Sequence, residues 1–130
     1  MTARLIAEYG GIALGLSLAF WGLFHQLIVG GAATIFRNVS EHEARLFVMS
    51  WVAQGGFMTF AGLLPALLLL FHNSVDPAVR TVIGVTGLAL ILLAGHVLLT
   101  GFRTHVRPVR IGAIFELIFG FYLLTLLILF

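Results

Sequence analysis

Residues 109–130 read VRIGAIFELIFGFYLLTLLILF, an apolar run that contains one carboxylate, Glu116. A helix of about 20 mainly apolar residues is long enough to cross the hydrocarbon core of a bilayer, which is about 30 Å thick. Three similar runs precede it, at about 5–36, 44–71 and 78–102. The four predicted spans fill nearly the whole chain, 1–130, as a single transmembrane domain. Because the loops between them are short, we expect an all-α, up-down-up-down antiparallel four-helix bundle in a membrane.

The composition of the chain excludes an ordinary soluble domain. Of its 130 residues, 61% are hydrophobic and 9% are charged, and the mean hydropathy is +1.14. A typical soluble domain is about 45–50% apolar and about 25% charged. A soluble chain of this length would leave about one third of its unfolded surface in water, and here that surface would be apolar. The net charge of +2 comes from residues spread along the chain, so we predict no nucleic-acid partner.

Two residue types are missing from the sequence, and each absence excludes a chemistry. There is no cysteine, which excludes disulfides, iron–sulfur clusters and thiolate catalysis. All seven residues in the Lys and Arg class are arginine. The lack of lysine excludes Schiff-base chemistry and a P-loop.

The segments between the predicted spans contain helix-start signals. Ser40, followed three residues later by Glu43, predicts a capping box, in which each residue satisfies a free backbone N–H of the other. Asp76 before Pro77 predicts an N-cap with proline in the first turn of the helix. Pro65 lies inside the second apolar run, where we expect it to kink the helix.

Arginines near the ends of the spans are divided unequally between the two sides of the membrane. Five border the first and third loops: Arg37, Arg45, Arg103, Arg107 and Arg110. Only Arg4 and Arg80 lie on the other side. Cytoplasmic loops carry the excess of positive charge. We therefore expect a multi-pass protein of the cytoplasmic (inner) membrane, with the N-terminus and the C-terminus both outside.

Each predicted span carries one strongly polar residue: His25, Gln54, His96 and Glu116. With a rise of about 1.5 Å per residue, all four fall in the cytoplasmic half of the membrane, so we expect one polar layer. A charge at the centre of a span costs about 2.5–3.5 kcal/mol on insertion scales, so such residues need compensation. Glu8 is different, because it lies near the outer end of the first span and is expected to reach the headgroups.

Glu116 is the most informative member of this layer. It lies between Gly112 and Gly120 on one stripe of its helix, a groove of small residues of the kind found where membrane helices approach closely. A carboxyl group in apolar surroundings favours its neutral form unless a cation is near. The candidate cations are Arg103 and the two histidines of the layer.

The third span has two candidate contact faces. His96 shares one face with Thr100 and Arg103, whereas Gly84 and Gly87 lie on the opposite side of the helix. Since small residues allow close helix contacts, one face is expected to pack inside the bundle and the other against a second subunit.

The leading functional hypothesis is non-enzymatic: binding or transport of a small ligand or of protons through the polar layer. An intramembrane carboxylate binds either a proton or a cation, and this competition couples the two. Trp21 and Trp51 lie beside the layer and offer aromatic faces to a cation. Four helices alone make a narrow site, so we expect a homo-oligomer in the bilayer or an assembly with other membrane subunits.

Three alternatives remain open from the sequence. His25 and His96 are candidate axial ligands of a haem b. Together with Glu116 they would form a two-histidine, one-carboxylate site for a divalent metal, as in a membrane enzyme. In the third alternative, the chain is an accessory subunit of a larger complex, and the polar residues only fix the register of the helices. The sequence assigns no cofactor among these possibilities.

Overall fold

A computed structural model describes residues 3–33, 39–101 and 106–130 of the chain. The described residues form helices and connecting turns without any strand. The helices are α1 (Ala3–Leu27), α2 (Val29–Ala33), α3 (Glu41–Phe71), α4 (Pro77–Gly101) and α5 (Arg107–Leu129).

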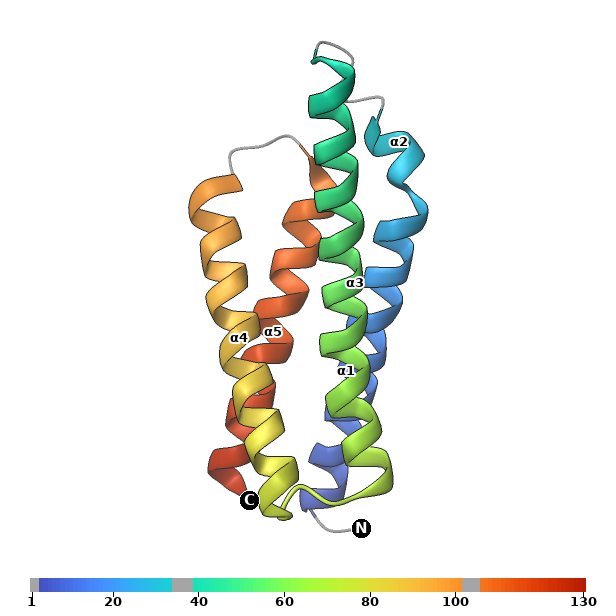
Figure 1. The fold of residues 1–130 in the computed structure, drawn as a ribbon. Coiled ribbons are helices and arrows are strands. Elements are labelled where there is room, and N and C mark those ends of the chain that lie inside the picture. Colours follow the sequence, from blue (N-terminus) through green and yellow to red (C-terminus); the bar gives the residue numbers. More distant parts are fainter. Residues whose placement is uncertain (1–2, 34–38, 102–105) are drawn as a thin grey trace.

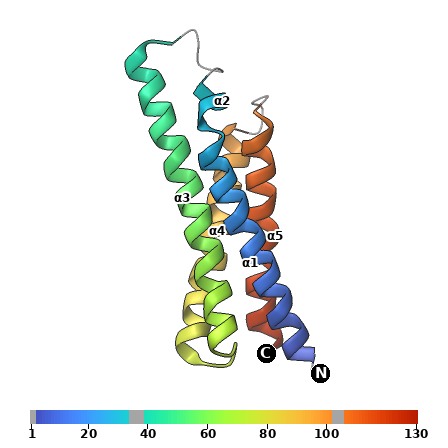
Figure 2. The same ribbon diagram turned by 90° about the vertical axis from the view of Figure 1, so that its right-hand side faces the viewer.

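The four long helices alternate in direction, and both termini lie at the same end of the bundle (Figure 1). This arrangement confirms the predicted all-α, four-helix bundle. We call the end with the termini and the α3–α4 loop the terminal end, and the end where α1 leads into α2 the far end. At the far end α3 extends beyond the other helices (Figure 2).

The predicted first span does not continue as one helix. The chain forms a turn at Ile28, after which α2 adds one short segment. Gly30 and Gly31 follow this turn, and glycine costs about 1 kcal/mol relative to alanine inside a helix, which explains the weak continuation. The end of the predicted span, 34–36, lies outside the described residues, as do Arg37 and Arg103.

The predicted helix starts are confirmed. The Ser40 hydroxyl accepts a hydrogen bond from the Glu43 backbone N–H (3.3 Å), and the Glu43 carboxylate accepts one from the Ser40 backbone N–H (2.8 Å). Asp76 Oδ1 accepts from the Ala78 backbone N–H at 2.8 Å. Pro65 lies inside α3, which continues past it to Phe71.

Glycines bring the helices together in two close pairs. In the first pair, a Cβ atom added at Gly22 of α1 would lie 2.6 Å from the backbone oxygen of Gly55 in α3. In the second pair, a Cβ atom at Gly120 of α5 would lie 2.8 Å from the backbone oxygen of Gly87 in α4. Such distances leave no room for a side chain, so glycine is required where these backbones meet.

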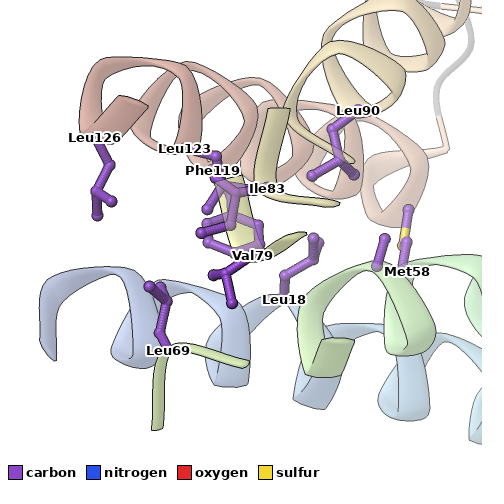
Figure 3. Close-up of a cluster of buried hydrophobic side chains, with 10 residues drawn as sticks. Leu18, Met58, Leu69, Val79, Ile83, Leu90, Phe119, Leu123 and Leu126 are labelled. Atoms are coloured by element: carbon purple, nitrogen blue, oxygen red, sulfur yellow. The ribbon is translucent and has the colours of Figure 1, made fainter. Parts of the chain in front are cut away.

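A hydrophobic core joins the two pairs of helices. Leu18, Met58, Ile83 and Phe119 are almost completely buried and come from all four long helices (Figure 3). The outer surface is apolar as well, and Leu99 is 89% exposed. Each of the four long helices is long and apolar enough to cross a membrane. By length and composition, the chain is therefore a small multi-pass membrane protein.

Candidate functional site

Glu116 lies on the inner face of α5 and is completely buried. Gly112, Ala113 and Gly120 on the same stripe are buried too, which agrees with the groove expected from their spacing. Neither carboxyl oxygen has a hydrogen-bond partner among the described residues. Glu116 therefore faces protein and not lipid, and its hydrogen-bonding capacity is unused.

Trp21 of α1 lies beside this groove. Its ring stacks on Phe115, with the ring centroids 5.8 Å apart. Its indole Nε1 is buried without a hydrogen-bond partner among the residues that the structure describes, and it would lie 3.3 Å from a Cβ atom added at Gly112. Gly112 is one helical turn from Glu116. The indole N–H is thus an unused donor within about one turn of an unused carboxyl group.

His25 and Trp51 form a second buried group, nearer the far end. Their rings are parallel within 8°, with centroids 4.1 Å apart. The Trp51 indole N–H donates to the backbone oxygen of His25 at 2.6 Å. His25 is completely buried, and both of its ring nitrogens lack a hydrogen-bond partner within the described chain. Trp51 therefore fixes the position of His25 while leaving its ring nitrogens unused.

Gln54 is partly buried on α3, between Trp51 and Met58. Its side-chain Nε2 is buried and has no hydrogen-bond partner in the described residues. The spacing of three and four residues places it near the face of α3 that carries both buried neighbours. Gln54 thus adds an unused donor near the level of His25.

His25 and Glu116 lie at different depths. Trp21 of α1 lies beside Gly112 of α5, and the two helices run in opposite directions. From that common level, His25 lies one turn toward the far end and Glu116 lies one turn toward the terminal end. Their separation along the bundle axis is about 12 Å, given a rise of about 1.5 Å per residue. The polar residues of these two helices therefore occupy two levels and not the single expected layer.

The structure does not bring His96 to the other three residues, since its side chain is exposed on the outside of α4. The opposite face of α4 packs inward, and Gly87, Leu90 and Ala94 there are buried. Close packing of the small residues decides which face turns inward, and His96 consequently faces outward.

This placement corrects the expected ligand sets. His25 is buried in α1 and His96 is exposed on α4, the helix diagonal to α1 in the bundle, so the pair does not face one haem. Within the described ranges there is also no group of three His, Cys, Asp or Glu side chains that could hold a metal ion. Arg103, the candidate cation, lies outside these ranges.

At the terminal end, the structure shows polar contacts that the sequence did not predict. Glu8 is buried, and its Oε1 accepts hydrogen bonds from the Ser74 backbone N–H (2.8 Å) and hydroxyl (2.6 Å). The Tyr122 hydroxyl donates to the backbone oxygen of Ala7 at 2.8 Å. The expectation that Glu8 reaches the headgroups is therefore wrong, because the α3–α4 loop brings Ser74 over it. In the sequence, the only indication of the Glu8–Ser74 contact was a serine in the loop on the same side of the membrane as Glu8.

The unused polar atoms all lie away from the terminal end. In the described part of the chain, the buried side-chain nitrogen and oxygen atoms without a hydrogen-bond partner number six and belong to Trp21, His25, Gln54 and Glu116. Trp21 and Gln54 supply N–H donors, whereas His25 and Glu116 donate or accept according to protonation.

No known protein family, curated protein or solved structure matches the chain.

Proposed function

We propose that the protein binds a small cationic ligand or protons inside the membrane and transports them, with Glu116 as the exchanging group. The observation that carries this proposal is the complete burial of Glu116 without a hydrogen-bond partner in the described residues. A carboxyl group inside a membrane binds a proton or a cation, and the competition between them couples the movement of protons to the movement of the cation. An unpaired buried polar group costs about 1–3 kcal/mol of stability. A proton or cation bound at Glu116 would supply the missing partner.

The surroundings of Glu116 support a cationic ligand. Trp21 and Phe115 stack on each other within about one turn of the carboxyl group, and aromatic faces attract cations. The side chain of Met58 lies beside Gly112, and methionine adapts its shape more easily than branched residues. The proposed site thus combines a carboxyl group, an aromatic wall and one deformable side chain.

The assembly and the orientation are parts of the same proposal. Leu18 and Phe119 fill the core of the single bundle and leave no wide path for a ligand through it. The proposal therefore places the path between the subunits of a homo-oligomer. The outward face of α4, which carries His96, is the surface we assign to contact with a second copy or another membrane subunit. The excess of arginine near the first and third loops favours a cytoplasmic far end, with both termini outside.

Infrared difference spectroscopy tests whether Glu116 exchanges a proton. The purified protein is titrated with acid and base while the band of the protonated carboxyl group is followed. We expect a titrating band in the wild-type protein and in Glu43→Gln, which keeps a capping-box residue at an exposed position. The other four carboxyl side chains contribute to the same spectral region, so only the Glu116 component should be lost in Glu116→Gln. A titration spectrum identical to that of the wild-type protein excludes Glu116 as the exchanging group.

Transport is tested in liposomes that contain a pH-sensitive dye. An inward gradient of ethidium or tetraphenylphosphonium should drive protons outward through the wild-type protein and the Glu43→Gln variant. Glu116→Gln should lower this proton flux at least tenfold, because the amide exchanges no proton. If Glu116 titrates normally but neither cation drives a proton flux, the proposal that Glu116 binds protons remains. The proposal that the protein transports this class of cation is then rejected.

A further inference from the structure

A groove of about 270 Å³ lies on the surface at the terminal end, between the first turns of α1 and the last turns of α3. Its polar lining includes Arg4, Glu8, His72 and Asn73, and its apolar wall includes Leu5, Ile12, Leu69 and Leu70. Arg4, His72 and Asn73 stand near the helix ends, whereas Ile12, Leu69 and Leu70 lie further along the helices. The groove thus changes from polar to apolar in the direction in which a bilayer does.

The groove is lined by one arginine, Arg4, and one carboxylate, Glu8, and the arginine is the more exposed of the two. The Arg4 side chain is 43% exposed, whereas the side chain of Glu8 beside it is 8% exposed. The Glu8 carboxylate already accepts two hydrogen bonds from Ser74. Glu8 Oε1 lies 3.8 Å from Arg4 Nε, and among the described residues no hydrogen bond to the remaining N–H donors of the guanidinium group is seen. An anion at the rim therefore meets the guanidinium group and not the buried carboxylate.

The position of the groove fits the membrane interface. Arg4 is the second residue of α1, and His72 directly follows the last residue of α3. Tyr9 also lines the groove and is 56% exposed. Tyrosine is enriched at the level of the headgroups, and arginine binds phosphate through paired N–H donors.

We propose that this groove binds one anionic phospholipid, with its phosphate on Arg4 and His72 and an acyl chain along Ile12, Leu69 and Leu70. The occupant is a lipid and not free phosphate, because Ile12, Leu69 and Leu70 form an apolar wall that continues onto the outer surface of the helices. Leu70 is 55% exposed and Phe71 is 74% exposed at this end of α3. The site is independent of the exchange proposed for Glu116, which lies deeper in the bundle.

Native mass spectrometry of the protein released from detergent tests the proposal. Phosphatidylglycerol and phosphatidylcholine of equal chain length are added in turn, and the fraction of protein with one bound lipid is measured. We expect phosphatidylglycerol to be retained preferentially. Arg4→Gln should lower its retention about tenfold, as expected for the loss of one charge-assisted contact. Arg4→Lys should restore part of the retention, since the positive charge remains.

Arg45→Gln is the matched control, because Arg45 is an exposed arginine at the far end that pairs with Glu41 through the same spacing. It should leave the retention of phosphatidylglycerol unchanged. Equal losses in the two glutamine variants, or no preference for phosphatidylglycerol, would overturn the proposal. Displacement of the lipid by millimolar inorganic phosphate would also overturn it, because the apolar wall would then contribute nothing. A thermal melt of each variant identifies any loss that arises from unfolding.

Discussion

Glu8 at the terminal end and Glu116 in the interior are both buried carboxyl groups, yet their surroundings differ. Glu8 accepts two hydrogen bonds from Ser74, and Tyr122 and Arg80 at the same end also donate to backbone oxygens. Glu116 has no hydrogen-bond partner in the described chain. Polar groups at the terminal end therefore hold the helices and the α3–α4 loop together. Toward the far end, Trp51 and Gln26 also form hydrogen bonds between α1 and α3, but Glu116 and the His25 ring have no such partner in the described residues.

The packing of the helices does not show this difference. Gly62 meets the backbone oxygen of Gly15 in the half nearer the termini, and Gly22 meets that of Gly55 in the other half. The α1–α3 contact is equally close at both places. The contrast therefore concerns the hydrogen bonding of the two carboxyl groups and not helix separation.

The largest expected effect tests this equality of packing. Gly62→Ala and Gly22→Ala should each destabilise the protein by about 3 kcal/mol, because the new methyl group meets backbone atoms that cannot move independently. Gly56→Ala is the control, since a Cβ atom there meets nothing within 4 Å. Thermal unfolding in detergent, followed by circular dichroism, measures the change. A loss for only one of the first two variants would show that the halves differ in packing as well.

The next effect tests whether the terminal end depends on its paired carboxylate. Glu8→Ala should destabilise the protein by about 2 kcal/mol, because the buried N–H and hydroxyl of Ser74 lose their acceptor. The same thermal melt measures it. Glu43→Ala, at an exposed helix cap, is the control and should have a smaller effect. A change for Glu8→Ala no larger than that of the control would mean that this contact does not hold the loop.

The smallest expected effect concerns Glu116. Glu116→Met keeps an unbranched side chain of similar length and removes two buried oxygens that have no hydrogen-bond partner in the described part of the chain. The stability should stay unchanged or rise by about 1 kcal/mol, while proton exchange is lost. A marked loss of stability would assign Glu116 a structural role like that of Glu8. The contrast between the two carboxyl groups would then disappear.

Most of the fold follows from local properties of the sequence. Apolar runs of sufficient length predicted the four spans, and the pairs Ser40–Glu43 and Asp76–Pro77 predicted two helix starts that the structure confirms. The stripe of small residues around Glu116 also predicted its burial correctly. These features depend on residues within one helix or one turn, so their spacing in the sequence is sufficient to predict them.

The candidate site was predictable only in part. Burial of Glu116 agrees with the groove expected from its neighbours, whereas the expected single polar layer does not hold, because His96 is exposed and the other polar residues lie at two levels. The contact between Trp51 and His25 joins residues 26 positions apart. No spacing rule relates residues on different helices, because the relative rotation and height of the helices are set by their packing.

The sequence alone therefore determined the four long helices, roughly where they start and that they suit a membrane, because length, hydropathy and capping are local. Tertiary structure decided which face of each helix turns inward. In a membrane both the lipid and the protein core are apolar, so hydrophobicity does not distinguish the faces. Close contacts such as Gly87 with Gly120 make this choice and place His96 outside. Tertiary structure also paired Glu8 with Ser74, 66 residues away, while leaving Glu116 without such a partner in the described residues.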